Sequence, residues 1–256
     1  MTEFNYDGIP KGYYDTVMEC GSVGRRFWHR HKFLTVKAVI GDTSRGGSIL
    51  DVGCFAGSFL KLLDRAAFTE QLGVDILEQQ IAYANEKYGT EFRRFEYVPN
   101  ISKLQATFAG RQFDVLTCIE VIEHLRHDEI RELFAFAARA LRAGGRLIVS
   151  TPNYFSIWPL LEYGLNRFSD VSYEEQHVTK FTYLDLERKL RSIYPDLDRQ
   201  FRVVLKTTSH FLAPWLAMFS ERLARRVSEL VRPKRWRFPF GALCILSLEK
   251  IVAAEG

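Results

Sequence analysis

The chain has 256 residues, of which 47% are hydrophobic and 26% charged, and its mean hydropathy is −0.12. These values fit one folded domain with a sizeable core, and they exclude a disordered chain or a bundle of membrane-spanning helices. The formal net charge is +4, but seven basic residues and two acids give residues 221–237 a charge of +5, so the rest of the chain is about neutral.

Residues 1–47 are expected to form a helical extension. The apolar spacing of Phe33, Val36, Val39 and Ile40 predicts a helix that packs on a sheet. The chain does not begin with a basic segment followed by an apolar one, so we expect no secretory signal and a cytoplasmic location. The four cysteines are widely spaced, which favours buried thiols over disulfides or a zinc site.

A strand, a glycine turn and a helix are expected next. Ile49–Val52 reads as a buried strand, and Gly53 and Gly57 allow a sharp turn and the close approach of a ligand. A helix is predicted near Ser58–Ala67. This order is typical of the nucleotide-binding start of a doubly wound α/β sheet.

The pattern then alternates between strands and helices. Further strands are predicted at 72–75, 92–98, 113–118 and 146–150, with helices near 77–88 and 128–141. Alternating residues at 201–208 and 243–249 predict two more strands. We therefore expect an α/β fold, a Rossmann-like seven-stranded sheet with helices on both faces.

Two amphipathic insertions interrupt this pattern. The first, 153–176, follows the strand at 146–150 and is rich in aromatic residues; the second, 212–237, separates the last two strands and carries arginines between its apolar residues. A single domain is predicted, with the extension at 1–47, a cofactor-binding core at 48–193, and C-terminal strands with their insertion at 194–256.

Four segments carry a family resemblance. The strand and glycine loop at 49–60, Leu72-Gly73-Val74-Asp75, the strand at 113–119 with the polar cluster after it, and Gly144-Gly145 with the strand that follows occur in this order. Between Ser48 and Ile193 the chain thereby resembles the class I S-adenosylmethionine-dependent methyltransferases. The glycine loop lacks the middle glycine of G-x-G-x-x-G, which disfavours a dinucleotide oxidoreductase.

The resemblance implies a set of cofactor-binding residues. Asp75 would accept hydrogen bonds from both ribose hydroxyls, while the backbone at Gly53 and Gly57 would approach the methionine and ribose portions. Phe55 stands where the family most often has glycine, so we expect a reshaped loop. Asp51 would orient the loop amides or cap the turn. The adenine would be contacted by Ile76, Asn100 and Ile101, and the methionine end by Ile119 and Glu120.

The sequence Glu-Val-Ile-Glu-His at 120–124 suggests the catalytic chemistry. If the chain is helical from Glu120, then Glu120, Glu123 and His124 share one face and can hold Mg²⁺, with the distant His177 as a fourth ligand. This arrangement resembles ubiquinone-biosynthesis O-methyltransferases and small-RNA 3′-end 2′-O-methyltransferases. The alternative is a metal-free site in which His124 shapes the pocket or acts as a base, while the glutamates are solvated or cap the helix.

The insertions bear on the acceptor. The aromatic residues of 153–176 favour an apolar acceptor, and the basic amphipathic stretch 212–237 either contacts an anionic membrane or nucleic acid, or packs on its own domain. We predict O-methylation of a small or lipid-linked hydroxyl compound, such as a quinone precursor, a glycan or a lipid intermediate. The alternatives are a 2′-O-methyltransferase of RNA ends and a non-catalytic S-adenosylmethionine-binding or interaction module.

Overall fold

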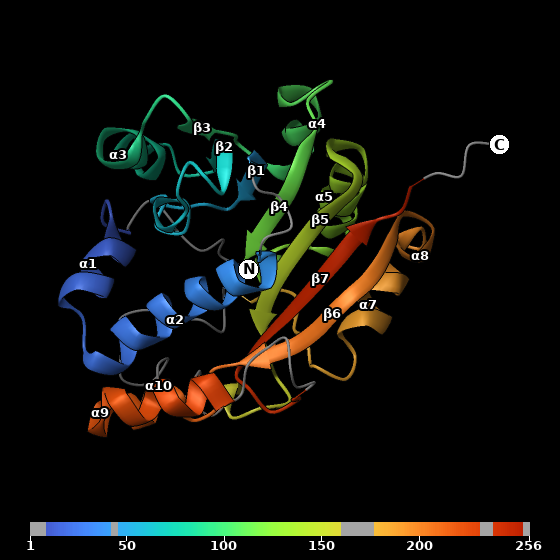
Figure 1. The fold of residues 1–256 in the computed structure, drawn as a ribbon. Helices are drawn as coiled ribbons and strands as arrows, with labels where there is room; N and C mark the ends of the chain where they lie inside the picture. The colour runs from blue at the N-terminus through green and yellow to red at the C-terminus, as the bar shows by residue number, and fades with distance from the viewer. Residues whose placement is uncertain (1–8, 42–45, 160–176, 231–237, 253–256) are drawn as a thin grey trace.

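Seven strands form one sheet at the centre of the molecule. The computed structural model describes residues 9–41, 46–159, 177–230 and 238–252. The sheet order is β3-β2-β1-β4-β5-β7-β6 (Figure 1). The strands are β1 (Gly47–Val52), β2 (Phe68–Asp75), β3 (Arg93–Tyr97), β4 (Phe113–Ile119), β5 (Leu141–Pro152), β6 (Phe201–Ser209) and β7 (Leu243–Lys250). The predicted seven-stranded sheet is confirmed.

The strand order fixes where a ligand can bind. The first five strands pair in parallel, and β7 is antiparallel to both β5 and β6. β1 lies between β2 and β4. The chain therefore continues from β1 towards one edge of the sheet and from β4 towards the other edge. In open α/β sheets such a switch point leaves a crevice beyond the carboxyl ends of the strands. The loops at 53–57, 75–77 and 120–124 all meet there.

Helices cover both faces of the sheet, as predicted. α2 (Val23–Ile40) and α3 (Glu78–Tyr88) pack on the side of Ile49 and Ile148, whereas α5 (His127–Ala140) and α7 (Leu186–Ile193) pack on the side of Leu50 and Leu147. Neighbouring strand residues point to opposite faces, so one strand serves both cores. The remaining helices are α1 (Tyr13–Cys20), α4 (Leu104–Thr107), α8 (Leu197–Gln200), α9 (Ala213–Phe219) and α10 (Glu221–Leu230), with short 3-10 turns η2 (Leu60–Leu62), η3 (Ile101–Lys103) and η4 (Ile122–His124).

The α5 helix shows how sequence spacing produces this packing. Ile130, Leu133, Phe134 and Ala137 recur every three or four residues, and all are fully buried. Burying each of the three larger side chains contributes roughly 1.5–3 kcal/mol. At the start of α5 the Arg126 backbone N–H donates to Glu129 Oε2 at 2.9 Å, which anchors the first turn.

The helix predicted near Ser58–Ala67 is wrong. Only the 3-10 turn Leu60–Leu62 forms there, and β2 begins at Phe68 rather than at Leu72. Side chains replace the missing helical hydrogen bonds: the Gln71 amide donates to the Asp64 carbonyl at 3.1 Å, and Arg93 Nη2 donates to the Leu63 carbonyl at 2.7 Å. The glycine loop is therefore not followed by an α-helix N-terminus.

The C-terminal insertion folds as two helices, α9 and α10, at the sheet end reached by the arrowheads of β4 and β5 (Figure 1). Its last part, 231–237, lies outside the described residues, as do 160–176 of the aromatic insertion and 1–8 of the extension. No helix in the described ranges is long and apolar enough to cross a membrane.

Candidate active site

The glycine loop after β1 adopts a backbone that side chains normally avoid. Gly53 and Gly57 both have φ +75°, and Phe55 between them has φ 48°. A Cβ at Gly53 would lie 2.3 Å from Val121 Cγ2, and one at Gly57 would lie 2.6 Å from the Phe95 ring. Both positions therefore require glycine, for the conformation and for the packing. Phe55 keeps the left-handed backbone that glycine would adopt, so the loop retains its turn.

Asp75 is tied into this loop from the end of β2. Its Oδ2 accepts a hydrogen bond from the Phe55 N–H at 2.8 Å, and its Oδ1 accepts one from the Leu77 N–H at 3.0 Å. Burial raises the pKa of this carboxyl to about 6. A carboxylate oxygen has two lone pairs, so both oxygens can accept a further hydrogen bond from a ligand hydroxyl.

The other residues expected at the cofactor are spread around this crevice. Ile76, directly after Asp75, is 48% exposed and free to cover a flat ligand. Asn100 and Ile101 lie at η3, where Asn100 Oδ1 accepts from Ser102 Oγ at 2.6 Å. Ile119, the last residue of β4, is buried.

Asp51 lies inside the sheet rather than at the loop amides. It is buried in β1, and Thr117 Oγ1 of the neighbouring β4 donates to its Oδ1 at 2.6 Å. Burial, with a smaller contribution from the charge of nearby Asp75, raises the pKa of Asp51 to about 7. The structure therefore joins Asp51 to the strand beside it.

The first helix closes over the glycine loop. The Tyr14 ring of α1 packs against the Phe55 ring with centroids 4.6 Å apart. The next residue, Asp15, is 1% exposed and accepts hydrogen bonds from Ser58 Oγ at 2.8 Å, Lys61 Nζ at 2.7 Å and Tyr88 Oη at 2.5 Å. Burial alone would raise the pKa of Asp15, but these hydrogen bonds hold it below its usual value.

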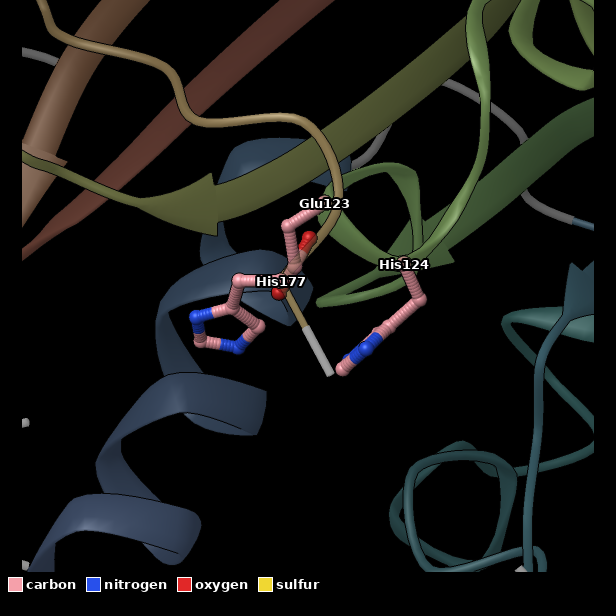
Figure 2. A group of neighbouring side chains, drawn as sticks. All are labelled: Glu123, His124 and His177. Atoms are coloured by element: carbon pink, nitrogen blue, oxygen red, sulfur yellow. The ribbon is translucent and has the colours of Figure 1, made fainter. Parts of the chain in front are cut away.

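Glu123, His124 and His177 come together at the second part of the site (Figure 2). One ligand atom from each residue lies within 4.8 Å of the others. Two bonds bring the His177 segment to η4: the Thr179 N–H donates to the Glu123 carbonyl at 2.9 Å, and Thr179 Oγ1 donates to the Leu125 carbonyl at 2.7 Å. The cluster follows β4 directly, and the Val121 that precedes it contacts Gly53, so it adjoins the glycine loop.

The Glu123 side chain is buried. By hydrogen-bond geometry neither carboxylate oxygen has a partner among the described residues, although the nearby Thr151 hydroxyl holds the pKa of Glu123 lower than burial alone would. Burial, and then the charge of Glu120, raise the pKa of Glu123 well above its usual value. Burial also lowers the pKa of His177 to about 3, and its Nδ1 is hydrogen-bonded to Tyr154 Oη at 2.8 Å. A neutral His177 thus lies beside an acid that has no hydrogen-bond partner among the described residues.

The structure does not bring Glu120 into this cluster. Glu120 has φ 54°, so the helix expected from Glu120 does not form, and η4 starts only at Ile122. The carboxylate of Glu120 instead forms an ion pair with Lys32 Nζ of α2, whose side chain is 4% exposed. Lys32 Nζ also lies 5.5 Å from the centre of the Tyr14 ring.

A series of aromatic rings leads away from the cluster. Each ring has its centroid 4.3–6.2 Å from the next. In order from the cluster, the residues are His177, Trp158, Trp28, His210, His31 and Phe27. Burial lowers the pKa of His31 to about 4. Neutral imidazoles and indoles thus make this side apolar and aromatic.

A cavity of about 570 Å³ lies elsewhere, where the end of β7 meets the start of β6. Its lining charges already pair with one another, as in Arg202 with Glu249 at 2.6 Å and Arg191 with Asp198 at 2.8 Å. It is remote in sequence from every predicted site residue, and we assign it no role.

Sequence reasoning missed several residues that build the site. Asp15, Lys32, Tyr154 and Thr179 are not among the site residues predicted from the sequence. A lysine and an aspartate at apolar helix positions were the available signals, because such positions are rarely charged unless the charge is paired. Their partners lie 43 to 88 residues away, so no local pattern reveals them.

The comparisons with known proteins agree with this geometry. A family described as "Methyltransferase domain" matches residues 27–195, about two-thirds of the chain. A ubiquinone biosynthesis O-methyltransferase from Idiomarina loihiensis is 31% identical over 109 residues, 42% of this chain and 43% of that protein. The chain therefore spans about two-fifths of the length of that relative.

Two solved structures show the same fold. A SAM dependent methyltransferase from Archaeoglobus fulgidus gives a TM-score of 0.61 at 16% identity, covering 93% of this chain and 99% of that one. The methyltransferase domain of bacterial CtHen1 gives 0.59 at 17% identity, covering 88% and 99%. These findings confirm the family that the glycine loop and Asp75 indicated. The chain belongs to the methyltransferase-domain family of S-adenosylmethionine-dependent enzymes.

Proposed function

We propose that this protein transfers the methyl group of S-adenosylmethionine to a hydroxyl oxygen of a small or lipid-linked acceptor, such as a quinone precursor, a glycan or a lipid intermediate. The observation that carries the proposal is the Glu123–His124–His177 cluster, in which Glu123 and His177 are buried and which adjoins the glycine loop and Asp75. One side of the crevice offers acceptors for a sugar, and the other offers groups that handle a proton.

The donor is placed by the residues after β1, β2 and β4. Asp75 would accept hydrogen bonds from the two ribose hydroxyls while it keeps its bonds to the Phe55 and Leu77 amides. Ile76 would cover the adenine, with Asn100 and Ile101 at its edge. Ile119 and the Lys32–Glu120 pair would face the methionine end, whose carboxylate and ammonium groups match the charges of the pair.

The reaction is an in-line displacement. A lone pair of the acceptor oxygen forms the new O–C bond as the C–S bond breaks, and the sulfonium becomes a neutral thioether. The hydroxyl proton must leave, and the imidazole of His124 or His177 is placed to take it. Glu123, whose carboxylate oxygens have no partner among the described residues, would orient these rings and, when ionised, stabilise the charged imidazole. Alignment in a dry pocket supplies much of the rate.

Mg²⁺ fits this cluster by its donor atoms. Two oxygens of buried Glu123, which have no partner among the described residues, lie beside two imidazoles, and one ligand atom of each residue lies within 4.8 Å of the others, so a bound cation would satisfy the carboxylate. We propose that Glu123, His124 and His177 hold the ion, and the ion pair with Lys32 supports a role for Glu120 at the donor instead. When bound, the ion would lower the pKa of the acceptor hydroxyl.

The first experiment measures methyl transfer from labelled S-adenosylmethionine to quinone precursors, lipid-linked glycans and RNA ends. Transfer to a hydroxyl of the first two classes supports the proposal, and transfer to RNA alone would replace the acceptor. Calorimetry with S-adenosylhomocysteine tests the donor site separately. Absence of binding would leave only an interaction role.

A second experiment tests the metal. Calorimetric titration of Mg²⁺ into the wild-type protein should show binding that Glu123→Gln abolishes and Glu120→Gln retains. EDTA should reduce activity and added Mg²⁺ should restore it. Full activity in EDTA, or equal metal binding by the Glu123→Gln variant, would remove the metal and leave the histidines as the base.

A further inference from the structure

Helices α9 and α10 bury three alanines and expose several large apolar side chains. Ala213, Ala217 and Ala224 are at most 2% exposed and pack with side chains of α2. Met218 is 59% exposed, and Phe219, the last residue of α9, is 86% exposed. A surface helix ordinarily turns its large apolar residues inward. Helices α9 and α10 instead present several large apolar residues to the outside.

Other apolar side chains extend this exposed surface. Leu212, which precedes α9, is 44% exposed, and Leu223 in the first turn of α10 is 46% exposed. Isolated exposed leucines are common, but several large apolar residues on two consecutive helices are not. We call Leu212, Met218, Phe219 and Leu223, together with the arginines described next, the α9–α10 surface.

The same surface carries positive charge. Arg222, Arg225 and Arg226 are exposed on α10, and their spacing of three and four residues places them on one face, opposite the buried Ala224. Glu221 is shared between Arg225 at 3.6 Å and Arg26 at 3.8 Å. In the part of the chain that the structure describes, no acid pairs with Arg222 or Arg226.

We propose that the α9–α10 surface docks on an anionic lipid bilayer. Phe219 and Met218 would enter the boundary between headgroups and acyl chains, and the arginines would contact lipid phosphates. The combination of apolar side chains and arginines favours a lipid bilayer over the other candidates. A nucleic acid would need the arginines but not the apolar side chains. A second copy of this chain would bring its own positive charges against these arginines. The described part of the stretch 212–237 is thus the contact itself.

The proposal also deepens the proposed function, and it rests on that function where it concerns the acceptor. Phe27, which packs with the buried alanines of α9 and α10, begins the series of rings that ends at His177. A lipid-linked acceptor held in the bilayer would meet the protein at the two helices whose buried side contacts the start of this aromatic series. Docking would therefore place the site near its substrate.

The test uses the full-length protein and sedimentation with vesicles. Vesicles of equal phosphatidylglycerol and phosphatidylcholine should bind the wild type at low salt, and pure phosphatidylcholine should bind it much less. Replacing Phe219→Ser and Met218→Ser should reduce binding at least tenfold. Arg222→Gln with Arg226→Gln should reduce it about fivefold for each charge and flatten the salt dependence.

The matched control is Leu184→Ser with Arg188→Gln, an exposed apolar residue and an exposed arginine at α7. It should bind vesicles as the wild type does. Circular dichroism checks folding, and S-adenosylhomocysteine affinity should be unchanged in all variants. Loss of donor binding by the wild type would remove the proposed function and leave docking standing. The docking proposal would be overturned if the wild type did not bind anionic vesicles, or if the control variant lost as much vesicle binding as the α9–α10 variants. Dimerisation or RNA binding that depends on Phe219 would also overturn it.

Discussion

Two buried carboxyl groups stand on either side of the crevice, and they differ in what surrounds them. Asp75 holds the Phe55 and Leu77 amides, one on each oxygen, whereas Glu123 has no partner among the described residues. Both have a pKa raised by burial. The proposed donor side is thus organised before any ligand arrives, and the proposed acceptor side holds a carboxyl group whose partner is not among the described residues.

The largest effect should come from the acceptor side. Replacing His124→Ala or Glu123→Gln should reduce the rate of methyl transfer by roughly 10²–10⁴, the range of a lost acid–base group, while donor affinity stays unchanged. Because Glu123 has no hydrogen-bond partner among the described residues to lose, the free energy of unfolding of Glu123→Gln should not fall. Single-turnover kinetics and urea denaturation measure the two. A large loss of stability would mean that Glu123 is structural.

The next largest effect concerns the donor side. Asp75→Ala removes two hydrogen bonds to a charged group, worth about 1.5–3 kcal/mol each, so affinity for S-adenosylhomocysteine should fall roughly 10²- to 10⁴-fold. The fold should survive with some loss of stability, because two amides lose their acceptor.

The same calorimetry should be carried out on the wild-type protein over a range of pH. Since the charged carboxylate accepts both hydroxyls, donor affinity should fall as the pH drops below about 6, the pKa of Asp75. Binding that Asp75→Ala leaves intact would place the donor elsewhere.

A smaller effect concerns Asp51 and the pH dependence of the free energy of unfolding. The pKa of Asp51 is about 7 in the folded protein and near 3.8 when unfolded, so the folded state binds the extra proton between these values. The free energy of unfolding should therefore decrease as the pH rises from 4 to 7, by an amount on the order of a few kcal/mol. Urea denaturation at pH 5 and pH 8 measures it.

Asp51→Asn should flatten this decrease. The control Asp114→Asn should not, because hydrogen bonds from Ser48 and Arg142 outweigh burial and hold the pKa of Asp114 below its usual value, outside this pH window. Equal slopes in wild type and Asp51→Asn would show that Asp51 does not titrate there.

The smallest effect tests the rigidity of the glycine loop. Gly57 and Gly144 share φ +75°, but a Cβ at Gly57 meets the Phe95 ring while one at Gly144 meets open space. Gly144→Ala should cost about 1–2 kcal/mol from backbone strain, and Gly57→Ala roughly 1–3 kcal/mol more from overpacking. Thermal unfolding of both variants measures the difference. Similar melting temperatures would indicate that the loop yields.

The sequence alone predicted the sheet because strands buried on both faces and short glycine turns are local patterns. It also placed Asp75 and the Glu123–His124 pair at strand ends. It failed at 58–67, where apolar spacing suggested a helix but Gln71 and Arg93 bind the freed carbonyls instead. It could not place Glu120, because the pairing with Lys32 spans 88 residues and the left-handed backbone of Glu120 has no sequence signal.

One thiol offers a practical handle on the first helix. Cys20, the last residue of α1, is exposed, while Cys54, Cys118 and Cys244 are buried. A maleimide fluorophore should therefore label the unmodified protein at one position. That position is on the helix that Asp15 fastens to Ser58 and Tyr88, beside the glycine loop. The emission of the dye would report in real time whether the helix lifts when a cofactor enters or departs.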